Sequence, residues 1–134
     1  MKKKICFVTG SRAEFDLIRK LLILFEKSKH FELHVLVTGE HLSKVHGESY
    51  KYVKKFSFKN TIYIKNLNNN RNKNEIMNSI NAGNKKINLV LKKIKPDLVA
   101  IAGDRYEIIS AALCSFFLQI PIIHFFGGEV TSGS

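Results

Sequence analysis

Two short segments in the last third of the chain carry the residue types that proton transfer needs. Gly103-Asp104-Arg105 follows one very apolar run, and Gly127-Gly128-Glu129 follows another. Asp104 and Glu129 supply two carboxylates, and different surroundings can set one such group as an acid and the other as a base. Arg105 beside Asp104 adds a cation for a phosphate group. Together these residues indicate a site for a phosphate-bearing substrate such as a nucleotide sugar.

Structural roles explain several of the same residues. The spacing of Asp104 and Glu107 would suit Asp104 as the N-cap of a helix. His124 lies in the apolar run before the paired glycines, where a histidine is more often packed and hydrogen-bonded than catalytic. His41 could bond a sugar or a phosphate, or it could cap the next turn. The residues alone leave these alternatives open.

A third candidate segment, Thr9-Gly10-Ser11-Arg12, leads from an apolar run into an amphipathic stretch. Free N–H groups at the start of a helix attract an anion such as a diphosphate, and Arg12 could add a bidentate cation. An ordinary capped turn with a surface arginine explains the segment equally well. The glycine-rich dinucleotide fingerprint is absent, which disfavours a nicotinamide cofactor. No spacing of cysteines and histidines indicates a metal site.

The elements that must position these segments alternate between short apolar runs and longer amphipathic stretches, as βαβ units do. The pattern predicts strands at residues 4–9, 31–37, 61–64, 98–101 and 120–125. It predicts helices at 12–27, at 75–94 and from about residue 105, with a loop and short helix within 41–54.

The two long helices have identifiable starts and faces. Ser11 and Glu14 have the spacing of a capping box before the first helix. In that helix the apolar face is expected to hold Leu17, Leu21, Leu24 and Phe25. In the helix at 75–94, Gly83 weakens the prediction locally.

The order of elements predicts one α/β domain over residues 1–134, with a Rossmann-like doubly wound parallel sheet. Strand order should reverse between the first and fourth strands, and ligands bind outside the carboxyl ends of the strands at such a point. The four candidate segments, residues 10–16, 38–42, 103–107 and 124–131, all follow predicted strands. That coincidence predicts one site at this edge of the sheet.

The formal net charge of +11 is concentrated in the middle of the chain. Residues 51–95 hold 12 lysines or arginines and one acid, Glu75, in a stretch rich in asparagine. Solvated faces explain this composition better than a nucleic-acid surface, so no nucleic-acid partner is expected. A non-catalytic basic binding module remains an alternative, and it would bind nucleic acid in a salt-dependent way.

Cysteine usage and the apolar runs bear on the cellular compartment. Cys6 and Cys114 each lie inside an apolar run, so we expect reduced thiols and a cytoplasmic protein. Residues 108–126 form an apolar stretch long enough to span a bilayer. Pro121 and two polar residues interrupt it, which favours a buried helix followed by a buried strand over a membrane span.

Four segments together resemble the hydrolysing UDP-N-acetylglucosamine 2-epimerases of sialic-acid-type pathways. They are TGSRAEFDL at 9–17, TGEHL at 38–42, KPDLVAIAGDRYE at 95–107 and IPIIHFFGGEVTSG at 120–133. The combination of GDR with HxxGGE is the most specific part. The resemblance implies a GT-B arrangement, in which two Rossmann-like domains hold a UDP-sugar between them, and this chain would be its amino-terminal half.

The resemblance also implies a reaction. Members remove UDP by anti elimination to a 2-acetamidoglucal and then add water, which gives N-acetylmannosamine and UDP. Asp104 and Glu129 match the carboxylates assigned to proton abstraction at C2 and its counterpart steps. The substrate would be UDP-N-acetylglucosamine or a related UDP-acetamido sugar, such as the bacillosamine derivative used for legionaminic acid.

By the same resemblance, Arg12, Asp16 and Arg105 fall where the family contacts the nucleotide, and His41 matches a substrate-side position. The reaction needs no metal and no nicotinamide cofactor, and a homodimer is the family expectation. Family members are much longer than 134 residues, so we expect the second domain to be missing and these residues alone to be inactive. A GT-B glycosyltransferase, which shares the fold and the sugar donor, is the rival enzyme class.

Overall fold

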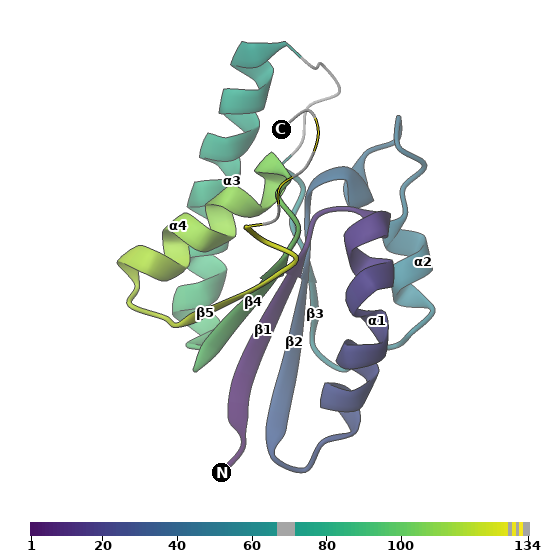
Figure 1. The fold of residues 1–134 in the computed structure, drawn as a ribbon, viewed down its shortest axis with the longest axis vertical. Coiled ribbons are helices and arrows are strands. Elements are labelled where there is room, and N and C mark those ends of the chain that lie inside the picture. Colours follow the sequence, from purple (N-terminus) through teal and green to yellow (C-terminus); the bar gives the residue numbers. More distant parts are fainter. Residues whose placement is uncertain (67–71, 129, 131, 133–134) are drawn as a thin grey trace.

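One parallel sheet organises the fold, and helices cover both of its faces (Figure 1). The computed structural model describes residues 1–66, 72–128, 130 and 132. The strands are β1 (Lys3–Thr9), β2 (Phe31–Val37), β3 (Thr61–Tyr63), β4 (Leu98–Ala102) and β5 (Ile122–Phe125). Their order is β3-β2-β1-β4-β5, and every neighbouring pair is parallel. The predicted doubly wound sheet with its reversal between β1 and β4 is therefore confirmed.

The connections carry four α-helices among the described residues. They are α1 (Arg12–Lys27), α2 (Tyr50–Lys54), α3 (Lys73–Ile94) and α4 (Ile109–Phe117). Two short 3-10 turns, η1 (Gly39–Leu42) and η2 (Tyr106–Ile108), follow β2 and β4. Helices α1 and α2 pack on one face of the sheet, and α3 and α4 pack on the other.

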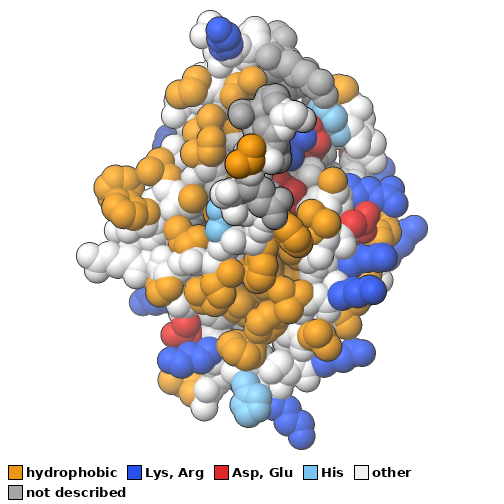
Figure 2. Space-filling view, viewed as in Figure 1, with side chains coloured by type: hydrophobic (Ala, Val, Ile, Leu, Met, Phe, Trp, Pro, Cys, Tyr) orange, Lys and Arg blue, Asp and Glu red, His pale blue; other side chains and the backbone are white. Residues whose placement is uncertain are grey.

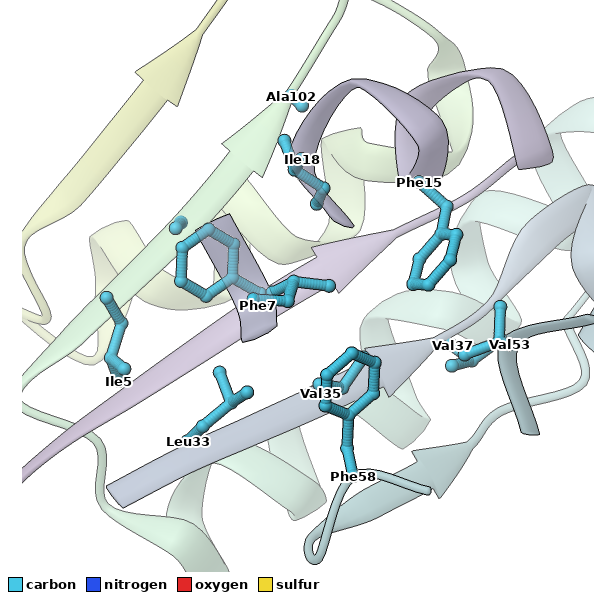
Figure 3. Close-up of a cluster of buried hydrophobic side chains, with 12 residues drawn as sticks. Ile5, Phe7, Phe15, Ile18, Leu33, Val35, Val37, Val53, Phe58 and Ala102 are labelled. Atoms are coloured by element: carbon cyan, nitrogen blue, oxygen red, sulfur yellow. The ribbon is translucent and has the colours of Figure 1, made fainter. Parts of the chain in front are cut away.

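The period-two alternation of a strand explains these two packing layers. In β1, Ile5 and Phe7 point into the cluster under α1, while Cys6 and Val8 point into the cluster under α3 and α4. Figure 3 shows the first cluster, where Phe15 of α1 meets side chains from the strands. Burial raises the pKa of the Cys6 thiol to about 12, so this cysteine behaves as a small apolar side chain.

Helix α1 has the predicted bounds but a different buried face. Phe15, Ile18 and Leu22 are buried, whereas Leu17 and Leu24 are 59% and 67% exposed. The predicted face is therefore wrong at Leu17 and Leu24. Apolar residues occupy more than one side of this helix, so periodicity could not choose between the sides, and contact with the sheet made the choice.

Gly83 lies in the middle of α3 and marks a close contact with the helix beside it. A Cβ atom at this position would lie 2.7 Å from the Ser110 hydroxyl oxygen of α4. The Ser110 hydroxyl in turn donates to the Ile80 carbonyl of α3 at 3.1 Å. The residue that weakened the helix prediction therefore allows α3 and α4 to approach each other.

The long apolar stretch at residues 108–126 folds as a helix and a strand, α4 and β5, as predicted. The expectation that both elements are buried is wrong. One side of α4 is exposed, with Ile109 at 47% and Leu113 at 42%, and β5 is an edge strand of the described sheet, with Ile122 and Ile123 at 38% and 41%. Figure 2 shows hydrophobic side chains on this face of the molecule, and both Phe116 and Phe117 are exposed. Within the described residues, no helix is long and apolar enough to cross a membrane.

Candidate active site

A cavity of about 350 Å³ opens at the carboxyl ends of β1 and β4, where the strand order reverses. Its walls come from the start of α1, from η1, from the loop before α2 and from the turn after β4. The lining residues are Ser11, Arg12, Ala13, Glu14, Leu17, Glu40, His46, Ser49, Gly103, Asp104 and Arg105. Three of the four predicted segments therefore meet at one cavity.

Two carboxylates hold Arg105. Its guanidinium donates to both carboxylate oxygens of Glu107, with Nε–Oε2 at 3.0 Å and an Nη–Oε1 contact at 2.8 Å, and it also bonds Glu40. The hydrogen bonds to Glu107 are the main reason that the pKa of Arg105 lies above its usual value. Because Glu107 is buried, the main role of the Arg105 guanidinium is to neutralise the negative charge of Glu107. Sequence reasoning treated Arg105 as a phosphate ligand and missed this pairing.

Asp104 is exposed and lines the cavity directly after β4. The helix-cap alternative is not observed, because Arg105 occupies the N-cap position of η2 and no side chain caps that turn. Among the described residues, no side chain or backbone group bonds the Asp104 carboxylate. It is therefore available to a ligand in the cavity.

Arg12 lies at the first turn of α1 and also lines the cavity. Its guanidinium stacks on the Tyr52 ring, 4.5 Å from the centroid, and its Nε lies 3.8 Å from Asp16 Oδ2. The side chain is 63% exposed, so this long ion pair contributes little to stability. Asp16 is not among the lining residues and accepts a hydrogen bond from the Tyr52 hydroxyl at 3.1 Å. Of these two predicted nucleotide contacts, the structure places Arg12 at the cavity.

His41 is fully buried behind the cavity wall. Its Nε2 lies 2.9 Å from the Thr9 hydroxyl oxygen, and its Nδ1 lies 2.8 Å from the Ser49 hydroxyl oxygen. Burial lowers the pKa of the imidazole to about 4, so the ring is neutral at physiological pH. His41 does not line the cavity, and its connection to the cavity runs through Ser49.

Glu14 is a lining residue that sequence reasoning assigned only to the helix cap. It is 4% exposed, and its Oε2 accepts the Gly10 N–H at 2.8 Å. Its Oε1 is buried and has no hydrogen-bond partner among the described residues. Burial, reinforced by the negative charge of Glu107, raises the pKa of Glu14 to about 7. A carboxyl group that gains and loses a proton near neutral pH is suited to general acid and base chemistry.

The family model described as UDP-N-acetylglucosamine 2-epimerase matches residues 24–134. The chain belongs to this family. The resemblance expected from the four sequence segments is therefore confirmed at the level of the family.

Several relatives match almost the whole chain. A GDP/UDP-N,N'-diacetylbacillosamine 2-epimerase (hydrolyzing) from Campylobacter jejuni is 38% identical over 133 residues, covering 99% of this chain and 34% of the relative. A UDP-N-acetylglucosamine 2-epimerase from Neisseria meningitidis is 34% identical, covering 98% of this chain and 34% of the relative. The chain thus spans about a third of the length of these 2-epimerases.

Solved structures of the family share the fold described above. The UDP-GlcNAc 2-epimerase from Neisseria meningitidis, solved with UDP-GlcNAc bound, superposes with a TM-score of 0.79 at 22% identity. The superposition covers 97% of this chain and 33% of that one. Another UDP-N-acetylglucosamine 2-epimerase structure has the same TM-score and covers the whole of this chain.

The second predicted carboxylate, Glu129, lies outside the described residues, so its pairing with Asp104 stays a prediction. His124 hydrogen-bonds the Gly103 carbonyl oxygen through Nε2, which ties the end of β5 to the turn that carries Asp104. This contact favours the structural alternative for His124. No three His, Cys, Asp or Glu side chains within the described residues could together hold a metal ion.

Proposed function

We propose that this chain supplies one wall of the active site of a hydrolysing 2-epimerase. The substrate would be UDP-N-acetylglucosamine or a related sugar such as UDP-N,N'-diacetylbacillosamine, and the products the free manno-configured sugar and UDP. The observation that carries the proposal is the meeting of Arg12, Glu14 and Asp104 at one cavity in a chain of this family. The name of the Campylobacter jejuni relative supports the hydrolysing type and the diacetylated substrate.

The chemistry needs a base, a leaving group and a directed water molecule. In the first step a carboxylate takes the C2 proton, the C1–oxygen bond to UDP breaks and a C1–C2 double bond forms. In the second step the oxygen of water bonds to C1, and C2 receives a proton on the face that gives the manno configuration. We propose Asp104 and Glu129 as the two carboxylates, with either order of roles.

The charged residues of the cavity wall support a position in which the sugar, rather than the diphosphate, lies against most of the wall. The described lining includes three carboxyl groups, Glu14, Glu40 and Asp104, and two arginines. Arg105 is already bonded to two carboxylates, so Arg12 is the arginine available for a phosphate oxygen. It lies at the start of α1, where the helix dipole also favours an anion.

Glu14 would serve as an additional proton-exchanging group beside this pair. Its buried Oε1 lies close to the turn that carries Asp104, because a Cβ atom built on Gly103 would be 3.4 Å from it. A protonated Glu14 adds no second negative charge beside Asp104, the carboxylate proposed as a base.

The test compares two proteins, because the chain spans about a third of its relatives. One is the 134-residue chain alone, and the other is a chimera in which this chain replaces the matching amino-terminal third of the Campylobacter jejuni relative. Both receive UDP-N-acetylglucosamine or UDP-N,N'-diacetylbacillosamine without an acceptor, and free sugar and UDP are quantified. We expect the chimera to release both products and the chain alone to release neither.

Two results would contradict the proposal. A folded chimera that releases UDP only when an acceptor sugar is present would be a glycosyltransferase. Release of UDP by the chain alone would show that the described wall is a complete active site, contrary to the proposal of a shared one.

A further inference from the structure

Ser49 lines the cavity, and its hydroxyl does not cap its own helix. Ser49 is the N-cap residue of α2, a position at which serine usually accepts a backbone N–H of the first turn. No side-chain cap bond forms there, and the hydroxyl oxygen instead lies 2.8 Å from His41 Nδ1. The hydroxyl is therefore directed to the imidazole and to the cavity rather than to α2.

The imidazole behind Ser49 is held on several sides. His41 is 0% exposed, its Nε2 lies 2.9 Å from Thr9 Oγ1, and its ring packs edge to face against Phe15. A neutral imidazole has one N–H donor and one nitrogen acceptor. The positions of its two oxygen partners therefore decide which nitrogen carries the proton.

The contacts of Thr9 decide which nitrogen of His41 carries the proton, because the Thr9 hydroxyl has a single proton and two neighbours. Its Oγ1 lies 3.3 Å from the Ser11 carbonyl oxygen, which can only accept, and 2.9 Å from His41 Nε2. Both contacts are attractive when Thr9 donates to Ser11 and Nε2–H donates to Thr9. The other tautomer would leave the Thr9 oxygen facing the carbonyl oxygen without a proton between them. The geometry thus places the proton on Nε2, and Nδ1 accepts the Ser49 hydroxyl proton.

We propose that the Ser49 oxygen accepts a hydrogen bond from an O–H or N–H group of the sugar bound in this cavity, with His41 as its positioning residue. The proposal rests on the proposed function, which supplies the sugar. Since His41 takes the Ser49 proton, the serine presents only lone pairs to the cavity. A sugar hydroxyl or an acetamido N–H can donate to them, whereas a diphosphate oxygen would be repelled.

The experiment titrates the chimera described above with UDP-N-acetylglucosamine and, separately, with UDP, and measures each affinity by calorimetry. Ser49→Ala should weaken binding of the nucleotide sugar by about 3- to 10-fold, the value of one neutral hydrogen bond, and leave UDP binding unchanged. Ser49→Thr keeps the hydroxyl and should restore the affinity. Ser43→Ala is the matched control, because the Ser43 oxygen also lies beside an imidazole, 2.9 Å from His46 Nδ1, but does not line the cavity.

A second readout follows the proton directly. Nitrogen chemical shifts of the His41 ring should show the proton on Nε2 in the wild type, whether or not ligand is present. A proton on Nδ1 would overturn the assignment, because Ser49 would then be a donor.

The binding outcomes separate this inference from the proposed function. Loss of UDP affinity in Ser49→Ala would overturn the inference, as would an unchanged affinity for the nucleotide sugar. Failure of the wild type to bind either ligand would instead count against the proposed function, and the inference would fall with it.

Discussion

Arg105 and Glu107 form a two-pronged ion pair in which the carboxylate is almost fully buried. The two hydrogen bonds measure 3.0 and 2.8 Å, and the Glu107 side chain is 1% exposed. A buried carboxylate without a partner is strongly destabilising, so the arginine keeps this charge in the fold. The same guanidinium bonds Glu40, and it thereby ties the turn after β4 to η1 across the cavity.

The Arg105–Glu107 pair predicts that a substitution of Arg105 destabilises the chain much more than a substitution of Lys51, which belongs to an exposed ion pair. Arg105→Gln should lower the free energy of unfolding by about 2 kcal/mol, less than for a fully buried pair because the arginine is 39% exposed. Lys51→Gln breaks an exposed pair with Glu48 of similar length, 3.0 Å, and should change the free energy of unfolding far less, because solvent screens this pair. Urea unfolding of the chain measures both. Equal effects would mean that Glu107 does not depend on Arg105.

Gly39, the first residue of η1, packs closely against Glu107. Its φ is +64°, and a Cβ atom there would lie 2.7 Å from Glu107 Cγ. Gly39→Ala should therefore destabilise the chain by about 3 kcal/mol, from backbone strain together with overpacking.

A second glycine separates these two causes. Gly47 has a φ of +79°, but no heavy atom lies within 4 Å of a Cβ built there. Gly47→Ala should cost only the strain, about 1 kcal/mol. Thermal or urea unfolding of both variants provides the comparison, and a Gly39→Ala variant no less stable than Gly47→Ala would rule out the close contact.

Sequence patterns predicted the fold well where local signals and global packing agreed. The bounds of α1 follow from the Ser11 cap and a long amphipathic run, and the parallel sheet follows from the alternation of elements. The buried face of α1 was missed because apolar residues lie on more than one side of it. The exposure of β5 was missed because an edge strand and a central strand can have the same apolar sequence.

Within the candidate site, the sequence predicted which segments meet better than it predicted the role of each residue. Asp104 and Arg12 line the cavity as expected. Arg105 lines the cavity, whereas His41 lies behind the cavity wall. The bonds of Arg105 to Glu40 and of His41 to Thr9 join segments that are 65 and 32 residues apart in the chain. Such partners leave no mark in local spacing.

Glu14 predicts an unusual dependence of stability on pH. The pKa of Glu14, about 7 in the folded chain, lies above the ordinary glutamate value of 4.5, so folding takes up a proton between these two pH values. In the wild type, the contribution of Glu14 to the free energy of unfolding is therefore fully present below pH 4.5 and is lost as the pH rises through 7. Glu14→Gln keeps an acceptor for the Gly10 N–H and removes the charge. The variant should gain about 3 kcal/mol relative to the wild type between pH 4.5 and pH 8.

Unfolding free energies of both proteins at several pH values test this, because other titrating groups cancel in the difference. Glu26→Gln serves as the control, since that carboxylate also accepts a backbone N–H, from Lys59, but does not line the cavity. The gain in stability should be larger for Glu14→Gln than for Glu26→Gln. A difference for Glu14→Gln that does not depend on pH would show that Glu14 is ionised in the folded chain at neutral pH.

Asp104 provides the sharpest test of catalysis in the chimera. Asp104→Asn removes the proposed base but keeps the size of the side chain, so turnover should fall by at least about 100-fold, within the range for loss of a general base. UDP binding should change little, because Asp104 is proposed to act on the sugar.

Asp97→Asn is the matched control, because Asp97 precedes β4 at the opposite end of the strand and accepts the Lys4 N–H at 2.8 Å. It should leave turnover unchanged, although it removes the same charge from the neighbourhood of the same strand. Measurement of kcat and KM for both variants, with UDP affinity determined separately, distinguishes a chemical role from loss of the fold. If Asp104→Asn retained turnover close to that of Asp97→Asn, the base would have to be sought among the other carboxylates, with Glu14 the first candidate.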